Sequence, residues 1–285
     1  RIGKTYLIQH WAEHLDDTHR VLYWMATQTS TTRQLRSFSQ TLLRFSNPES
    51  HIPPDFSYQS WETALMQVAQ LAQQERFILI LDEFTYVMQA DNEIPSIIQK
   101  IWDHHLQQSR LFLILTGSLA GIIQRTALDY HAPLYGRATA RLKLQPLPFG
   151  VLTQFLPNMS TEQRVAIYAL AGGIPAYIKQ FNDKLTIRDN LEDHLVSPAN
   201  IMLNDAVFLL REQLNDPRNY VAIIESIAAG YHRLTEIAKM AGMPTNHTAK
   251  YLSVLRELGY VQRLVPATVR HPERSKKGRY VISDP

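Results

Sequence analysis

The 285-residue sequence predicts an α/β fold, in which a parallel sheet with helices on both faces precedes a helical region and a winged helix-turn-helix domain. Three observations lead to this class. Apolar runs of strand length alternate with helix-period segments up to about residue 144. Strand patterns then disappear, and the last region predicts three helices before two short strands.

The first domain is expected over 1–145. Its strands are predicted at 20–24, 77–81, 111–115 and near 141–144, and the segments 32–45, 60–74 and 94–107 carry apolar residues at helical spacing. Each helical segment is long enough for the crossover that joins two parallel strands. The sequence therefore predicts one parallel sheet.

A helical lid is expected over 146–216 and a winged helix-turn-helix over 217–285. The lid is interrupted by Gly172-Gly173-Ile174-Pro175 and by Pro198. In the winged helix, helices are predicted at 218–229, 234–241 and 246–258, with two strands around a basic loop at 270–279. This last region holds 11 Lys and Arg against 5 Asp and Glu, whereas residues 1–216 hold 18 against 21, so the basic charge is concentrated in the tail.

Composition excludes several classes of protein. Hydrophobic residues make up 45% and charged residues 19%, which is ordinary for a globular chain. No apolar run reaches the roughly 18 residues of a membrane-spanning helix, and no signal peptide is visible. The absence of cysteine excludes disulfides and zinc–thiolate sites. We expect a cytoplasmic protein without a membrane partner.

The first residues match the end of a P-loop, G-x-x-x-x-G-K-[ST], in Gly3, Lys4 and Thr5. The glycine lets backbone N–H groups approach phosphate oxygens, the lysine neutralises phosphate charge, and the hydroxyl coordinates magnesium at a helix N-terminus. These residues are expected to bind ATP and Mg²⁺, and a solvated helix start is the alternative. Because the chain begins inside the motif, we expect the first strand to precede Arg1.

Two carboxylates end the second apolar run, as in a Walker B motif. A continuous apolar strand is buried on both faces, so Asp82 and Glu83 are expected at the edge of the sheet where ligands bind. Asp82 would hold magnesium together with Thr5, and Glu83 would polarise the attacking water. The alternative is a polar strand end that caps the next helix.

Hydroxyl groups follow the third apolar run. Thr116 and Ser118 are placed to reach the γ-phosphate or the attacking water, as at a sensor position. An equal alternative is that Ser118 caps the helix that follows it.

These segments resemble the archaeal and bacterial P-loop ATPases of the STAND group, part of the wider AAA-like class, which carry a C-terminal winged helix. The resemblance rests on RIGKT at 1–5, LILDEF at 79–84, LILTGS at 113–118, PLYGR at 133–137 and GGIP at 172–175. It implies that Arg137 brings positive charge to the γ-phosphate. It also implies that Gly173 and Pro175 form a lid turn near the adenine. A surface arginine and a simple helix-breaking turn are the alternatives.

The helix at 246–258 is expected to be a recognition helix that Thr245 caps. The side chains predicted to face a partner are Asn246, His247, Thr248, Lys250 and Tyr251, together with Arg274, Lys276 and Lys277 in the basic loop. Such a surface suits a phosphate backbone. Winged helices also bind proteins, so duplex DNA and a protein partner both stay open.

The sequence thus predicts a regulatory ATPase with slow hydrolysis, in which ATP is a switch ligand that changes the position or partner of the winged helix. A nucleotide-dependent oligomer belongs to this expectation. The competing interpretation is a DNA-binding or adaptor protein whose P-loop core binds nucleotide without significant turnover.

Overall fold

The computed structural model describes residues 2–16, 19–49, 51–74, 76–118, 123, 129–195, 208–211, 214, 216–271, 275 and 277–283. The chain divides into two compact units. One comprises Lys4–Lys143, and the other comprises Arg1–Gly3 together with Leu144–Pro285. The predicted boundary between the lid and the winged helix stays a prediction.

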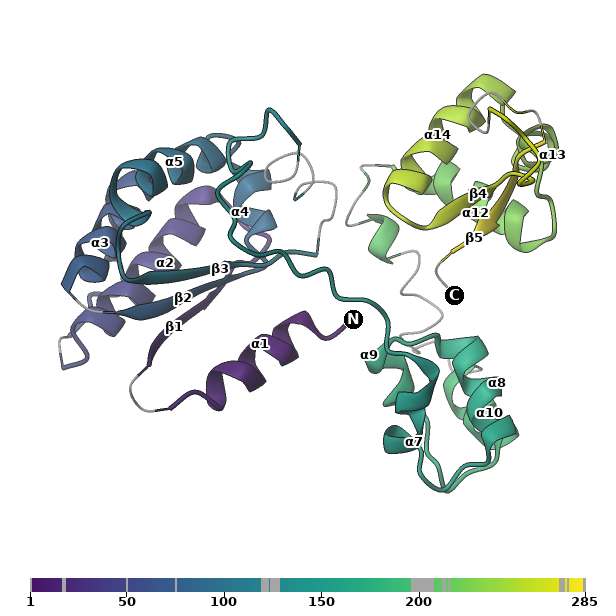
Figure 1. Ribbon diagram of the computed structural model, residues 1–285, viewed down its shortest axis with the longest axis horizontal. Helices are drawn as coiled ribbons and strands as arrows, with labels where there is room; N and C mark the ends of the chain where they lie inside the picture. Colours follow the sequence, from purple (N-terminus) through teal and green to yellow (C-terminus); the bar gives the residue numbers. More distant parts are fainter. Residues whose placement is uncertain are drawn as a thin grey trace. The chain divides into compact units, whose positions relative to one another are not determined.

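The unit Lys4–Lys143 contains a parallel sheet in the order β1-β2-β3. Its strands are β1 (Arg20–Met25), β2 (Phe77–Asp82) and β3 (Leu111–Leu115), which confirms three predicted strands. The helices are α1 (Lys4–Glu13), α2 (Thr31–Ser46), α3 (Trp61–Gln74), α4 (Thr85–Ala90) and α5 (Ile94–Ile101), and α5 continues into the π-helix η1 (Trp102–Leu106). Figure 1 shows α2, α3 and α5 on one face of the sheet and α1 on the other.

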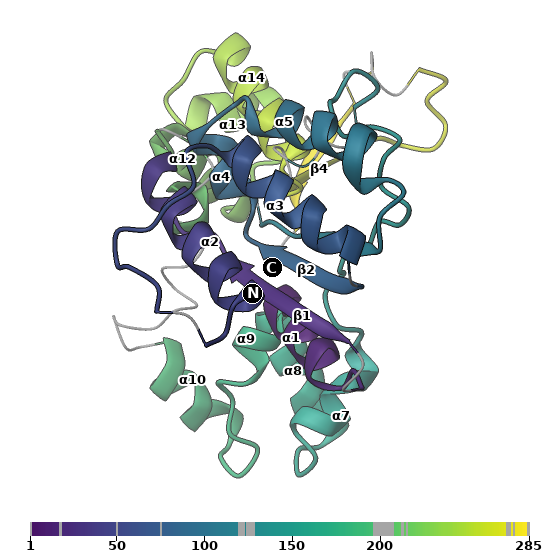
Figure 2. The ribbon, with the colours of Figure 1, turned by 90° about the vertical axis from the view of Figure 1, so that its left-hand side faces the viewer.

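The core of this unit lies between the sheet and α2 and α3, which lie side by side over it in Figure 2. Every residue of β2 is buried, as expected for a central strand with an unbroken apolar sequence. On β1, Leu22 and Trp24 point into the core, and the Trp24 ring packs edge-on against Phe38 and Trp61. The intervening Tyr23 therefore points to the opposite face, on which α1 lies.

The predicted strand near 141–144 is wrong. None of these residues forms a strand, and the side chain of Leu142 is 78% exposed. A strand needs a neighbour that satisfies its backbone N–H and C=O groups, and among the described residues β3 pairs only with β2. An apolar pattern alone does not supply this neighbour.

Helices make up the segment that follows, and no strand occurs in residues 144–195. They are η3 (Phe149–Val151), α7 (Leu152–Phe155), α8 (Thr161–Ala171), α9 (Pro175–Ile178) and α10 (Ile187–Leu195). Ser160 and Gln163 form a capping box at the start of α8. Leu152, Ile167 and Ile178 are fully buried in a small core of their own.

The remaining described residues form the predicted three helices and two strands. These are α12 (Arg218–Ala228), α13 (Leu234–Met240), α14 (Thr245–Glu257), β4 (Val261–Leu264) and β5 (Arg279–Ile282), with β4 and β5 antiparallel. Ile223, Ile237, Leu252 and Leu255 form the centre of their core. No helix among the described residues has the length and apolar character needed to cross a membrane.

Candidate functional site

Six of the predicted site residues meet at the carboxyl edge of the sheet. Lys4 and Thr5 begin α1, Asp82 ends β2 with Glu83 next to it, and Thr116 and Ser118 follow β3. Parallel strands bring their carboxyl ends to one edge, which is why residues 77 to 114 positions apart come into contact.

Asp82 is the centre of this arrangement, and its residue is fully buried. Its Oδ1 accepts hydrogen bonds from the Thr116 hydroxyl and, at 3.0 Å, from the Glu83 N–H group. Its Oδ2 accepts from the hydroxyls of Thr5, at 2.7 Å, and Tyr23, at 2.9 Å. A buried carboxylate with four donors is stabilised in its charged form.

The pKa of Asp82 reflects the same contacts. Burial alone raises this pKa. The hydrogen bonds from Thr116, Thr5 and Tyr23 lower it by more than burial raises it, so the pKa of Asp82 lies below its ordinary value. Burial and the hydrogen bond to Asp82 raise the pKa of Tyr23 to about 12. Asp82 is therefore ionised and Tyr23 is protonated at neutral pH.

The Glu83 carboxylate is held by Ser118. The Ser118 N–H group donates to Glu83 Oε2 at 2.8 Å, and the Ser118 hydroxyl donates to Oε1. Lys4 Nζ in turn donates to Ser118 Oγ at 3.0 Å. Glu83 has a φ of 49°, the one positive value at a non-glycine residue in the described chain. Such strain often marks a functional position.

The loop after β3 is packed tightly against the start of α4. The Phe84 N–H group donates to the Thr116 carbonyl at 2.9 Å, and the Thr116 N–H group donates to the Leu81 carbonyl at 3.0 Å. A Cβ on Gly117 would collide with the Thr85 side chain. Glycine is therefore required between the two hydroxyl residues of the site.

Gly3 precedes Lys4 and has a φ of 93°, a conformation that favours glycine. A Cβ at Gly3 would meet no atom within 4 Å, so the backbone conformation and not crowding explains the glycine. This agrees with the predicted phosphate-binding turn.

Arg137 is not brought to this cluster. Its Nε and Nη2 donate to the Asp103 carboxylate at 2.8 and 2.6 Å, and its Nη1 donates to the carbonyls of Pro133 and Tyr135. The Arg137 hydrogen bond lowers the pKa of Asp103. Asp103 belongs to η1, which leads through the turn at 107–110 into the start of β3. The pair therefore lies toward the amino edge of the sheet.

Gly173 and Pro175 belong to the other unit. The Gly173 carbonyl accepts a 2.7 Å hydrogen bond from the Leu147 N–H group, and Pro175 is the first residue of α9. The structure thus shows the helix-breaking turn that was the alternative, and the predicted role near the adenine stays a prediction.

On α14, the predicted exposure of Asn246, His247 and Lys250 is confirmed. The prediction for Thr248 is wrong, because this residue is fully buried and its hydroxyl donates to the Pro244 carbonyl at 3.1 Å. Thr248 precedes Leu252 by four positions and Leu255 by seven, so helical spacing already places it on the buried face.

Two further expectations about α14 change. Thr245 is the first helical residue, and the N-cap is Pro244, without a side-chain cap. Tyr251 is partly buried, and its hydroxyl accepts a 2.9 Å hydrogen bond from Asn219. In the basic loop, Lys277 is exposed, whereas Arg274 and Lys276 lie outside the described residues.

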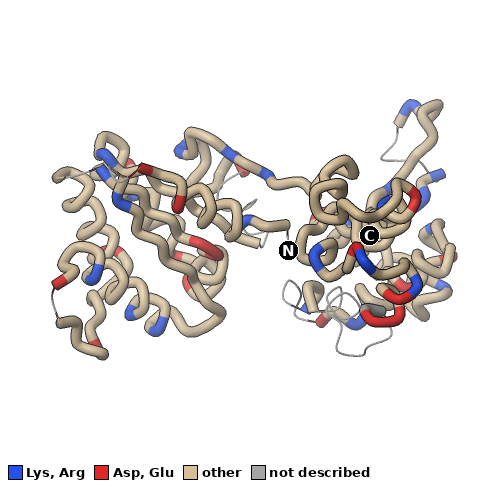
Figure 3. The backbone as a smooth tube through the Cα atoms, turned by 90° about the horizontal axis from the view of Figure 1, so that it is seen from below, with Lys and Arg blue, Asp and Glu red and all other residues tan. Residues whose placement is uncertain are grey.

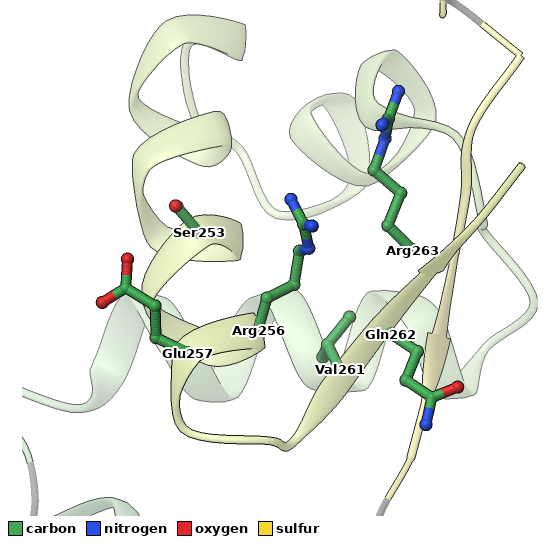
Figure 4. A pocket seen from close by; sticks show the side chains of 6 residues that line it. All are labelled: Ser253, Arg256, Glu257, Val261, Gln262 and Arg263. Atoms are coloured by element: carbon green, nitrogen blue, oxygen red, sulfur yellow. The ribbon is translucent and has the colours of Figure 1, made fainter. Parts of the chain in front are cut away.

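A polar cavity of about 500 Å³ lies between the end of α14 and β4. Figure 4 shows its lining residues: Ser253, Arg256, Glu257, Val261, Gln262 and Arg263. Arg263 also donates a hydrogen bond from its guanidinium to the Ser275 carbonyl. Basic and acidic positions are mixed in each unit in Figure 3.

Tyr23 is the site residue that the sequence analysis missed. It lies within an apolar strand and belongs to no motif. The available signal was its place in the strand: with β1 paired in parallel to the strand that ends at Asp82, a polar tip two residues before the end of β1 lies next to the carboxylate edge.

The residues at this edge fit magnesium and a nucleotide phosphate. The Thr5 hydroxyl donates a hydrogen bond to Asp82 and keeps oxygen lone pairs for a hard cation. The Lys4 ammonium has three donors, of which Ser118 takes one. No group of three or more His, Cys, Asp or Glu residues able to hold a metal occurs in the described parts of the chain. Phosphate oxygens and water would have to supply the other ligands, as is usual for Mg²⁺.

The chain belongs to the family of ATPase domains found predominantly in Archaea, which matches residues 1–181. An IclR helix-turn-helix domain matches residues 220–264. These matches confirm the archaeal ATPase family and the C-terminal helix-turn-helix, and with the parallel sheet they establish a P-loop NTPase-like α/β fold. Membership of the STAND group stays a prediction.

Two uncharacterized proteins of Methanocaldococcus jannaschii are similar to the chain. MJECL04 is 31% identical over 286 residues, which cover all of this chain and 60% of that protein. MJ0424 is 48% identical over 44 residues, which cover 15% of this chain and 43% of that protein. The chain therefore spans about 60% of the length of the first relative.

Two solved structures resemble the chain at low sequence identity. The Orc1 protein of Aeropyrum pernix in complex with DNA has a TM-score of 0.47 and 14% identity, and covers 100% of this chain and 81% of that protein. Cdc6p of Pyrobaculum aerophilum has a TM-score of 0.43 and 15% identity, and covers 99% and 81%. Both scores lie below 0.5, and the fold assignment rests on the sheet and the family match.

Proposed function

We propose that this protein is a nucleotide-dependent switch that binds Mg-ATP at the carboxyl edge of the sheet, hydrolyses it slowly and acts on duplex DNA through its helix-turn-helix domain. The observation that carries the proposal is the convergence of Lys4, Thr5, Asp82 and Glu83, which come from a helix N-terminus and a strand end, at one edge of the sheet.

Binding starts at the N-terminus of α1. The Lys4 ammonium neutralises phosphate charge, and the N–H groups after Gly3 meet phosphate oxygens at the positive end of the helix dipole. Thr5 and, through water, Asp82 would hold magnesium, which supplies charge neutralisation at the phosphates. A phosphate that attracts Lys4 competes with the 3.0 Å contact between Lys4 and Ser118.

Hydrolysis depends on Glu83. Its carboxylate is fixed by the N–H and hydroxyl groups of Ser118, and it is oriented to accept a proton from a water that attacks the γ-phosphate. In this role Ser118 acts through Glu83, in addition to the sensor role that the sequence predicts. Because two donors already engage this carboxylate, we expect slow turnover.

Arg137 is too far from the proposed site in its own chain to contact the γ-phosphate there. Its ion pair with Asp103 lies toward the amino edge of the sheet, and the five residues of β3 separate that edge from the site by roughly 16 Å. We therefore assign a γ-phosphate contact of Arg137 to a second copy of the chain, in an oligomer that forms with nucleotide.

The helical segment that contains Gly173 and Pro175 is proposed as the lid that follows nucleotide state, as in STAND-type switches. For DNA, the exposed side chains of Asn246, His247 and Lys250 at the start of α14 form the proposed recognition surface, together with the exposed Lys277, two residues before β5. The IclR-type match supports this assignment.

A second candidate function is a DNA-binding or adaptor protein that holds nucleotide without turnover. The observation that favours it is that Ser118 donates a hydrogen bond to each oxygen of the Glu83 carboxylate. Both candidates share the nucleotide site and differ only in hydrolysis.

The nucleotide site is tested by equilibrium binding of Mg-ATP to the full-length protein and to its Lys4→Ala variant. We expect the variant to lose at least tenfold in affinity, because a charged donor to phosphate disappears. Lys100→Ala is the matched control, since it removes an ammonium whose partner is Glu62. Equal affinities of wild type and Lys4→Ala would exclude the P-loop assignment.

A further inference from the structure

Tyr23 contacts the buried carboxylate of the site, and no step proposed above uses it. Its hydroxyl donates a 2.9 Å hydrogen bond to Asp82 Oδ2, the same oxygen that accepts the 2.7 Å hydrogen bond from Thr5. Tyr23 on β1 and Thr5 on α1 thus hold the same carboxylate oxygen.

The contacts of Asp82 account for all the acceptor positions of its carboxylate. Each carboxylate oxygen has two lone pairs. On Oδ1 they are taken by the Thr116 hydroxyl and the Glu83 N–H group, and on Oδ2 by the hydroxyls of Thr5 and Tyr23. A cation at this edge therefore does not meet a bare carboxylate oxygen unless a donor leaves.

This arrangement suits magnesium, which releases its water ligands reluctantly and uses few direct protein ligands. The Thr5 hydroxyl points its hydrogen toward Asp82 and keeps oxygen lone pairs for the cation. The Tyr23 hydroxyl donates its hydrogen bond to Asp82 Oδ2, so it holds the carboxylate in place rather than serving as a ligand.

We propose that Tyr23 is a positioning residue for the magnesium–nucleotide complex, because its hydroxyl holds Asp82 Oδ2 so that the Thr5 oxygen and water, and not the carboxylate itself, face the cation. The proposal rests on the proposed function. Partners of this kind, one bond removed from the metal, typically contribute about 10- to 100-fold to metal affinity.

The test compares nucleotide affinity with and without magnesium. Binding of a non-hydrolysable ATP analogue to the full-length protein is measured by isothermal titration calorimetry in Mg²⁺ and in EDTA, for wild type and Tyr23→Phe. We expect equal affinities in EDTA and a loss of about tenfold in Mg²⁺ for the variant. Tyr58→Phe removes a hydroxyl from the same unit that is not bonded to Asp82, and it should behave as wild type.

The ratio of the two affinities distinguishes the possible outcomes. The proposal would be overturned if the ratio of affinity in Mg²⁺ to affinity in EDTA were the same for Tyr23→Phe as for wild type. An equal loss of affinity in Mg²⁺ and in EDTA gives this result, because a hydroxyl with only a structural role affects both affinities equally. A wild-type protein that binds no nucleotide would instead refute the proposed function and this proposal with it. Tyr23→Met, which also lacks the hydroxyl, gives the same test if the Phe variant is unstable.

Discussion

Thr5 donates a 2.7 Å hydrogen bond to Asp82 Oδ2 and so joins the first turn of α1 to the end of β2. No side chain of α1 is fully buried, so this helix has few other strong attachments to the sheet. The same hydroxyl therefore anchors the helix and, in the proposed function, would present its oxygen to a cation.

Thr5→Val should loosen α1, because it leaves the buried Asp82 oxygen with one donor fewer. Losing a hydrogen bond to a buried charged group costs about 1–3 kcal/mol. We expect faster amide hydrogen exchange throughout α1 and nearly unchanged exchange in α2. Thr41→Val is the control, because the Thr41 hydroxyl donates to the Ser37 carbonyl within the same helix, α2. Unchanged exchange in α1 would show that the anchor lies elsewhere.

Gly117→Ala should destabilise the loop after β3. The new Cβ would collide with the Thr85 side chain, and overpacking of this kind costs about 1–3 kcal/mol. Within the described structure the buried Thr85 hydroxyl has no hydrogen-bond partner. Thr85→Ala therefore removes the atoms that the new Cβ would meet without breaking a hydrogen bond of that hydroxyl.

The free energy of unfolding in urea, measured for both single variants and the double variant, tests this contact. We expect the double variant to have a higher free energy of unfolding than the sum of the two single effects predicts. Gly150→Ala is the control, because its Cβ would meet no atom within 4 Å. Purely additive effects would mean that Gly117 and Thr85 do not restrict each other.

Asp103→Asn should lower stability at neutral pH by about 1 kcal/mol or less, because the Asp103–Arg137 pair is partly exposed and screened. The pKa of Asp103 is lowered in the folded state. The carboxylate therefore stabilises the fold above its unfolded-state pKa, and this contribution is lost as the pH falls through the folded-state pKa.

The difference in unfolding free energy between wild type and Asp103→Asn should accordingly vanish in acid below both pKa values. Asp55→Asn, at an exposed carboxylate, serves as the control. A difference that persists unchanged in acid would contradict the assigned ion pair.

Lys250→Ala should weaken binding of duplex DNA and reduce the salt dependence of log Kd by about one unit, if this exposed side chain of α14 contacts a phosphate. Thr248→Val tests the reassigned residue. It removes the hydrogen bond to the Pro244 carbonyl inside the domain and should lower stability without changing the salt slope. The opposite result, a changed slope in Thr248→Val alone, would restore the original prediction for Thr248.

The parts of the fold that depend on one element at a time were predictable. Apolar runs of strand length predict parallel strands, and this identified β1, β2 and β3, of which β2 is buried throughout. Residues that directly follow such strands share an edge, which placed Asp82, Glu83 and Ser118 together. The same pattern failed at 141–144, because strand formation also needs a partner strand.

Contacts that depend on the register or packing of two elements were not predictable. Tyr23 reaches Asp82 because β1 and β2 pair with a particular register, and Arg137 meets Asp103 because a loop packs on a π-helix 34 residues away in sequence. No motif records either relationship. The burial of Thr248, by contrast, follows from helical spacing.

The dependence of ATP hydrolysis on Glu83 is tested by Mg-ATP turnover of the full-length protein beside Glu83→Gln, each with and without duplex DNA. We predict slow wild-type turnover that responds to DNA, and a variant that binds ATP normally but does not hydrolyse it, because an amide cannot accept the proton of the attacking water. Tight binding without turnover in the wild type would favour the adaptor function. Unchanged turnover in Glu83→Gln would show that Glu83 is not the group that accepts the proton of the attacking water.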